Sequence, residues 1–153
     1  MPGVVLRLRL ERVLAASPRR VYALNTDPEL LALWWGPNGF SVPRVEADLR
    51  VGGRYRITMQ PPEGDPFFLS GEYRTVEPET RLAYTFRWEP PDPHDQETVV
   101  VLSLAPVEDG STALTIDQGD FATEDRRALH VQGWSESIDH LAELVANENP
   151  SAS

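Results

Sequence analysis

The chain has 153 residues, the size of one domain that can bury a hydrophobic core without further support. It contains no cysteine, which excludes disulfide bonds, thiolate metal sites and a cysteine nucleophile. Its formal net charge of −10 argues against a general binder of phosphate backbones, so we expect no nucleic-acid partner. No apolar run approaches the ~20 residues of a membrane span, and we expect a cytoplasmic protein without signal peptide or membrane insertion.

The charge is unevenly distributed along the chain. Residues 1–76 contain ten Arg and eight Asp or Glu, whereas residues 77–153 contain four Arg and sixteen Asp or Glu. An acidic, solvated face that promotes solubility explains this asymmetry. A docking surface for a basic partner is the alternative interpretation.

The first predicted element is a half-buried strand, because leucines alternate with charged residues from Leu6 to Glu11. Ser17-Pro18 then predicts a helix start, with Ser as N-cap and Pro at the first helical position. This short helix should run to about Asn25. Asp27-Pro28-Glu29 again places an N-cap residue before a proline and predicts a second short helix, which ends near Trp35-Gly36-Pro37.

The middle of the chain predicts an antiparallel meander. Alternating apolar positions separated by Gly- and Pro-rich turns predict six strands, at residues 42–47, 54–60, 67–76, 82–88, 98–104 and 112–118. Short turns between successive strands favour antiparallel pairing.

A long final helix is predicted from Thr123, its N-cap, to about Ala146. Its apolar residues recur at helical spacing and form one stripe: Trp134, Ile138, Leu141 and Val145. This helix should cover the apolar face of the sheet. The sequence thus predicts one α+β domain over residues 1–146, with about seven strands, two short helices after the first strand, and a flexible tail at residues 147–153.

Several short segments, in this order and spacing, resemble the activator of heat-shock protein 90 ATPase homologue family. The resemblance covers about residues 11–146. It is carried by Ala16-Ser17-Pro18, Val21 to Leu24, Thr26 to Leu30, Trp34 to Pro37, Glu46 to Gly53, Tyr55 to Ile57, Ser70 to Tyr73, Glu77-Pro78, Arg81 to Phe86 and Gly133-Trp134.

That family belongs to the START-like (SRPBCC) superfamily. The resemblance implies the helix-grip fold, in which a curved antiparallel sheet surrounds the long C-terminal helix. It also implies a cavity between the sheet and that helix. Such cavities serve very different ligands, so the resemblance does not name one.

The aromatic residues are the most informative candidates for a site. We expect the following residues to line a ligand cavity: Trp35, Phe40, Tyr55, Ile57, Tyr73, Tyr84, Phe86, Trp88, His130, Trp134 and Ile138. The tyrosine hydroxyls, two indole N–H groups and His130 could supply polar contacts to a ligand. The alternative is a solid core, in which these rings pack against each other and leave no space.

Other features of the sequence give weaker indications. Gly133 inside the final helix suggests close approach of the sheet or of a ligand, because glycine destabilises a helix interior. The acidic loop between Glu89 and Gln96, with His94, is best interpreted as solvated. His140 should be exposed. We identify no catalytic residue, no metal site and no cofactor.

Three functions remain open from the sequence. The first is binding of an apolar or aromatic small molecule in the cavity. The second is an enzyme of the same fold, for instance a cyclase or hydrolase, with His130 and a tyrosine or Glu72 as acid and base. The third is a chaperone-accessory module that docks through the acidic second half, and a homodimer is a further alternative.

Overall fold

The computed structural model describes residues 5–148, which form seven strands and three α-helices. The elements in chain order are β1 (Leu8–Leu14), α1 (Pro18–Thr26), α2 (Pro28–Leu31), β2 (Ser41–Ala47), β3 (Arg54–Gln60), β4 (Phe67–Glu77), β5 (Arg81–Glu89), β6 (Thr98–Pro106), η1 (Glu108–Gly110), β7 (Thr112–Gly119) and α3 (Glu124–Glu148). The predicted order of elements is confirmed, and most strand boundaries agree within two residues.

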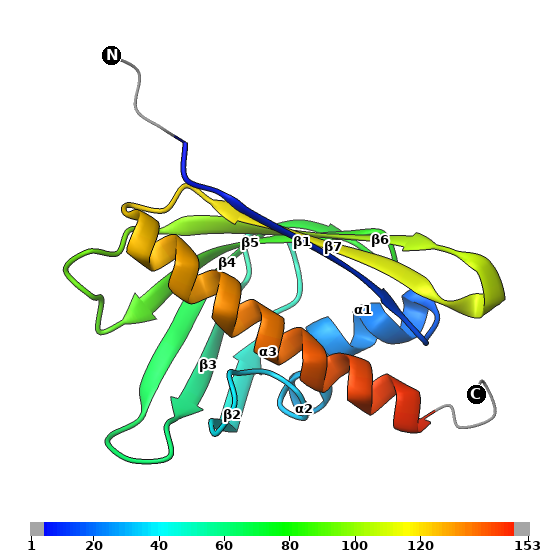
Figure 1. Ribbon diagram of the computed structural model, residues 1–153, viewed down its shortest axis with the longest axis horizontal. Helices are drawn as coiled ribbons and strands as arrows, with labels where there is room; N and C mark the ends of the chain where they lie inside the picture. The colour runs from blue at the N-terminus through cyan, green and yellow to red at the C-terminus, as the bar shows by residue number, and fades with distance from the viewer. Residues whose placement is uncertain (1–4, 149–153) are drawn as a thin grey trace.

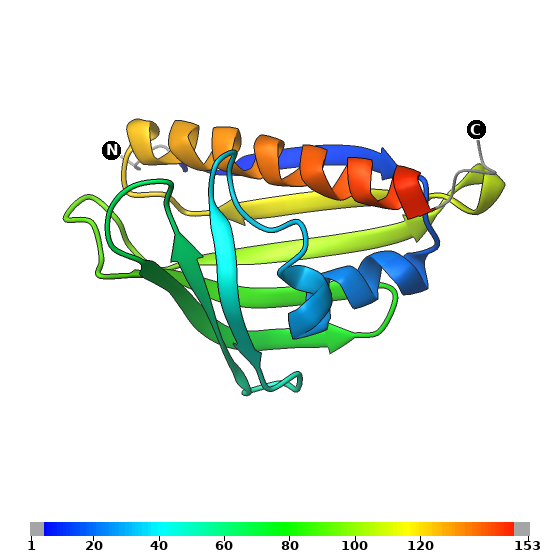
Figure 2. The ribbon, with the colours of Figure 1, turned by 90° about the horizontal axis from the view of Figure 1, so that it is seen from below.

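The seven strands form one antiparallel sheet in the order β1-β7-β6-β5-β4-β3-β2. Figure 1 shows all three helices on the same face of the sheet, with α3 crossing it diagonally. The sheet curls, so that β2 and β3 stand away from β6 and β7 and the helices lie in the concavity between them (Figure 2). This arrangement is the α+β helix-grip fold that the sequence predicts.

The two short helices begin as their capping residues predict. The Ser17 hydroxyl accepts a hydrogen bond from the Arg20 amide at 3.2 Å, and the Asp27 carboxylate accepts one from the Glu29 amide at 3.0 Å. The second helix is shorter than expected. It ends at Leu31, and the chain continues in turns towards Trp35.

The last helix extends further than the sequence predicts. Its start is confirmed, since the Thr123 hydroxyl accepts a hydrogen bond from the Arg126 amide at 3.1 Å. Its end is at Glu148 rather than near Ala146, because Arg20 on α1 holds the Glu148 carboxylate with two hydrogen bonds of 3.0 and 2.6 Å. Residues 147 and 148 belong to the helix, residues 149–153 lie outside the described part, and the flexible tail stays a prediction.

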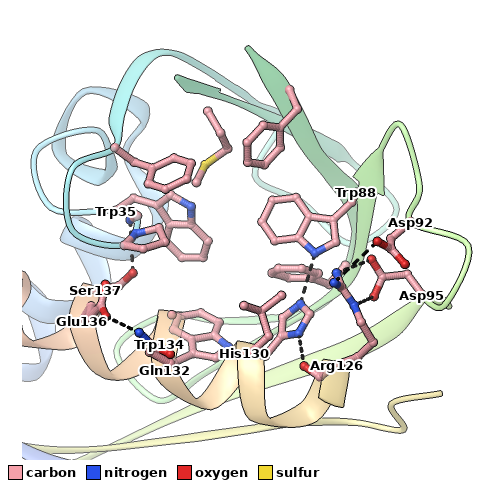
Figure 3. Close-up of a pocket in the computed structure, with 18 of the residues that line it drawn as sticks. Trp35, Trp88, Asp92, Asp95, Arg126, His130, Gln132, Trp134, Glu136 and Ser137 are labelled. Atoms are coloured by element: carbon pink, nitrogen blue, oxygen red, sulfur yellow. Dashed lines mark hydrogen bonds and ion pairs between the residues drawn. The ribbon is translucent and has the colours of Figure 1, made fainter. Parts of the chain in front are cut away.

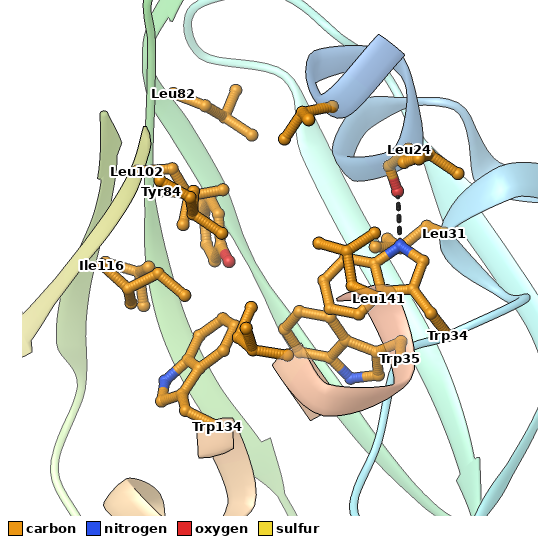
Figure 4. Close-up of a cluster of buried hydrophobic side chains, with 14 of the residues drawn as sticks. Leu24, Leu31, Trp34, Trp35, Leu82, Tyr84, Leu102, Ile116, Trp134 and Leu141 are labelled. Carbon is orange, nitrogen blue, oxygen red and sulfur yellow. Dashed lines mark hydrogen bonds between the residues drawn. The ribbon is translucent and has the colours of Figure 1, made fainter. Parts of the chain in front are cut away.

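The hydrophobic core lies where the second half of α3 meets the sheet, α1 and α2 (Figure 4). All four residues of the predicted stripe, Trp134, Ile138, Leu141 and Val145, are buried. Trp34 is buried beside them, and its indole Nε1 donates to the Leu24 carbonyl at 2.8 Å. Full burial of an aliphatic side chain contributes about 1.5–3 kcal/mol, so this half of the molecule anchors the helix firmly.

The structure also bears on the membrane question. Across residues 5–148, none of the helices combines the length and the apolar composition that a membrane crossing requires.

Candidate functional site

A cavity of about 500 Å³ lies between the first half of α3 and the curled sheet. Its walls come from the segment after α2, from β3, β4 and β5, from the β5–β6 loop and from α3 (Figure 3). Most of its interior is apolar and ring-rich: Trp35, Phe40, Met59, Phe67, Phe86, Trp88 and Trp134. The volume lies within the usual range for a small-molecule site.

The rim of the cavity is open to solvent and combines polar with apolar residues. Asn38, Pro90, Leu129 and Gln132 line it and are exposed. Deeper in the cavity, Trp35, Phe86 and Trp134 are at most 9% exposed. The cavity is therefore a pocket with an apolar interior and a hydrated entrance.

Edge-to-face contacts between neighbouring rings hold the aromatic wall together. Trp35 meets Trp134 with ring centroids 5.1 Å apart, and Trp88 meets Phe86 at 5.1 Å and Phe67 at 5.4 Å. This geometry is favourable for aromatic pairs. The rings thus support each other from the walls without filling the space between them.

The sequence-predicted site residues divide into three groups in the structure. Six line the large cavity: Trp35, Phe40, Phe86, Trp88, His130 and Trp134. Four others line a separate space of about 20 Å³ behind Trp35: Tyr55, Ile57, Tyr73 and Tyr84. Ile138 borders a third, shallow space beside β1 and β7, so it does not reach the large cavity. A ligand-binding role for the first six stays a prediction.

The polar atoms expected to contact a ligand are mostly engaged within the protein. Nε1 of Trp88 donates to Nε2 of His130 at 3.1 Å, and Nδ1 of His130 lies 2.8 Å from the Arg126 carbonyl. Nε1 of Trp134 donates to Gln118 Oε1 at 2.7 Å. The indoles and the imidazole therefore offer a ligand their faces and edges more than their hydrogen-bonding atoms.

These contacts define the state of His130. An Nε2 that accepts from Trp88 requires the neutral tautomer with its proton on Nδ1, which then donates to the Arg126 carbonyl. Burial lowers the pKa of His130 below its usual 6.5, although the Arg126 carbonyl and the Asp95 charge act in the opposite direction. His130 is thus neutral at physiological pH.

The acid–base pairs that the sequence suggested do not form. Tyr73 is buried on the concave face of β4, so the neighbouring Glu72 points to the opposite face, away from His130. The Tyr55 hydroxyl donates to the Thr85 carbonyl at 2.6 Å, and burial raises the pKa of Tyr73 to about 12. The hydroxyl of Tyr73 is therefore protonated near neutral pH and is a poor general base.

An ion pair that the sequence did not predict closes one side of the rim. Arg126 on α3 donates to both carboxylate oxygens of Asp95 at 2.7 and 2.6 Å, and Asp92 lies 3.8 Å from its other guanidinium nitrogen. The Asp95 side chain is 10% exposed, so the interpretation of this loop as solvated is wrong at that residue. The pair attaches the β5–β6 loop to the helix.

The opposite side of the rim is attached to the same helix. Glu136 accepts hydrogen bonds from the Asn38 amide at 2.9 Å and from Gln132 at 3.1 Å, and Ser137 accepts one from the Gly36 amide at 3.2 Å. The hydrogen bonds from Asn38 and Gln132 lower the pKa of Glu136, which keeps it ionised.

His140 also belongs to this attachment. It is half-buried, with Nε2 2.7 Å from Asn38 Oδ1 and Nδ1 3.3 Å from the Trp34 carbonyl. The expectation that it is exposed is wrong, because the segment after α2 folds back over this side of α3.

Gly133 lies in the wall of the cavity. A Cβ added there would meet no atom within 4 Å, so the glycine does not mark a close approach of the sheet. Its missing side chain instead leaves open space in front of α3. Arg126, His130, Gly133 and Ser137 share one helical face, which is rotated away from the predicted stripe. Extension of that stripe toward the start of the helix reaches Arg127, so the spacing of the apolar residues does not identify Arg126.

The curled sheet, the long helix and the cavity between them define a START-like, helix-grip protein. A family model described as activator of Hsp90 ATPase homolog 1-like protein matches residues 15–146, and the chain belongs to this family. The resemblance noted in the sequence is thereby confirmed.

Solved structures agree with this membership. A protein from Nitrosomonas europaea is 33% identical and has a TM-score of 0.80, over 97% of this chain and 99% of that one. A protein from Chromobacterium violaceum is also 33% identical, with a TM-score of 0.79 over 91% and 96% of the two chains. CalU16 from Micromonospora echinospora, at 22% identity and a TM-score of 0.68 over 95% and 80%, shares the fold. The comparison with curated proteins finds no match.

Proposed function

We propose that the protein binds an apolar or aromatic small molecule in the cavity between α3 and the sheet. The observation that carries this proposal is the 500 Å³ of space among aromatic side chains that are themselves well packed. A collapsed or solid interior would have left no room for a ligand. The space instead persists beside a dense core in the same molecule.

The energetics favour an apolar occupant. Rings already fixed by edge-to-face contacts lose little freedom when a ligand arrives, which lowers the cost of binding. Removal of apolar ligand surface from water contributes about 25 cal/mol per Å². The engaged indole and imidazole nitrogens provide few hydrogen bonds in compensation for a strongly polar ligand.

Native mass spectrometry of freshly purified protein tests the proposal, with Gly133→Phe as the comparison. The phenyl ring would enter the open space in front of α3 and occupy the cavity. We expect a non-covalent small-molecule adduct on the wild type that Gly133→Phe lacks. A wild type without any adduct, even after exposure to apolar aromatic compounds, would contradict the proposal.

The family description favours a second candidate, a protein-directed role at a chaperone. The excess of acidic residues after residue 76 would supply the docking surface. A pull-down with the purified chain at low and high salt would test it, because binding through exposed charges weakens as salt rises. A salt-insensitive result or an absent partner would argue against this role.

A further inference from the structure

We propose that the ligand carries a cationic nitrogen, held at the rim of the cavity, on an apolar or aromatic body held inside. This inference rests on the proposed function and names the chemical class of its ligand. It follows from the charges around the rim and from the aromatic interior.

The charges that line the cavity are mostly negative. Asp92, Asp95 and Glu136 contribute three carboxylates against the single guanidinium of Arg126. His130 adds no positive charge, since both its nitrogens are engaged in the neutral form. The lining therefore has a formal charge of −2, which favours a cation and disfavours an anion.

The one cationic side chain of the lining has little capacity left for an anionic ligand. Two nitrogens of Arg126 already donate to Asp95 in a bidentate pair. An anion would have to compete with that carboxylate. Asp92 Oδ2, in contrast, lies 3.8 Å from Arg126, beyond hydrogen-bond distance, and its side chain is 41% exposed. It can accept a hydrogen bond from an incoming ammonium group.

The carboxylates flank the cavity on two sides. In Figure 3, Asp92 and Asp95 lie on the side of the cavity that Trp88 occupies, and Glu136 lies on the opposite side, with Ser137. A cationic group at the entrance would therefore experience both negative regions. The indole faces below the rim add a second attraction, because aromatic rings present negative charge density to a cation.

Three pyrene derivatives that differ only in charge test this inference. Pyrenemethylamine is cationic near neutral pH, pyrenemethanol is neutral and pyrenecarboxylate is anionic. Fluorescence titration at low ionic strength should give the amine an affinity about 10-fold higher than the alcohol, and the carboxylate the lowest affinity. Equal affinities, or a preference for the carboxylate, would overturn the charge inference while leaving the proposed function intact.

Matched variants locate the effect. Glu136→Gln should reduce the preference for the amine about threefold, because it removes one rim carboxylate but keeps an acceptor for the Asn38 amide. Glu143→Gln makes the same change in net charge on the exposed side of α3, outside the lining, and should leave the preference unchanged. Equal effects of the two variants would assign the preference to net charge and overturn the inference.

Gly133→Phe distinguishes binding inside the cavity, which the proposed function and this inference both require, from binding at the outer surface. It should abolish binding of all three probes. Undiminished binding of the amine would place it on the acidic exterior and overturn the inference. Failure of all three probes to bind the wild type would instead remove the proposed function, and the inference with it.

Discussion

At the scale of single residues, Gly133 connects helix stability with the cavity. Glycine destabilises a helix interior by about 1 kcal/mol relative to alanine, yet here no neighbouring atom requires it. The open space in front of it belongs to the cavity. The helix is weaker at the point where a side chain would reduce the volume of the cavity.

Gly133→Ala should therefore stabilise the fold by about 0.4–1 kcal/mol, because the methyl group meets nothing and the unfolded chain loses freedom. Urea denaturation measures this change. A loss of stability would show that the wall of the cavity at Gly133 is tighter than the structure indicates.

His130 gives a second prediction at this scale. Burial lowers the pKa of His130 below 6.5, so the unfolded chain binds a proton first as the pH falls. Its contribution to stability is therefore complete above about pH 6.5 and is lost as the pH drops toward the folded-state pKa.

His130→Gln should then show a smaller fall in melting temperature between neutral and mildly acidic pH than the wild type. His94→Gln, at an exposed position of the β5–β6 loop, serves as the control for the loss of an imidazole. A pH dependence of His130→Gln identical to that of the wild type would contradict the burial of a neutral imidazole.

At the scale of elements, the β5–β6 loop depends on its ion pair with α3. Asp95→Asn would leave Arg126, whose side chain is 18% exposed, without its bidentate partner. We expect a loss of about 1–3 kcal/mol and faster amide exchange in residues 90–97.

Glu97→Gln is the matched control in the same loop. Its partner Arg87 is 61% exposed, so this pair contributes little, within about 0.5 kcal/mol. Equal effects of the two variants would mean that Arg126 does not fix the loop.

The first turn of α3 positions Arg126 and His130, and its N-cap should matter accordingly. Thr123→Ala should cost about 1 kcal/mol, because the Arg126 amide loses its acceptor. Thr123→Ser keeps the hydroxyl and should recover most of that loss. Chemical denaturation measures the free energy of unfolding of both variants. Equal destabilisation of the two would indicate that a lost methyl contact, and not the lost cap, is the cause.

The sequence predicts the elements well because local signals define them. Ser17, Asp27 and Thr123 cap the three helices as expected, and the alternation of buried residues along β3 and β6 follows the pattern of the chain. α3 ends two residues beyond its predicted end, and the Arg20–Glu148 pair at that end joins residues far apart in the chain, which local spacing does not reveal.

Only part of the site can be predicted, because the rest of it depends on contacts between residues far apart in the chain. Aromatic spacing identifies inward-facing residues, and so finds Trp88 and Trp134. It cannot tell that Trp35 separates Tyr55 and Tyr84 from the large cavity, since this depends on the path of the chain after α2. The Asp95–Arg126 contact likewise depends on where a long loop folds.

At the scale of the whole molecule, the two halves of the helix–sheet interface have different roles. Around Leu141 and Val145 the interface is solid and supplies stability. Around Gly133 and Trp134 it is open, and the loops on both sides of the rim are attached to the helix. The acidic second half extends to the rim of the cavity. A homodimer stays a prediction from the sequence.

The central claim is that a ligand enters among the rings of the cavity, and the four tryptophans report on it separately. Trp35, Trp88 and Trp134 line the cavity, whereas Trp34 is buried in the core and donates a hydrogen bond to the Leu24 carbonyl. In ¹H–¹⁵N spectra, titration with pyrenemethanol should shift the indole resonances of the first three strongly and that of Trp34 least. Four unmoved resonances, or a response led by Trp34, would contradict the account.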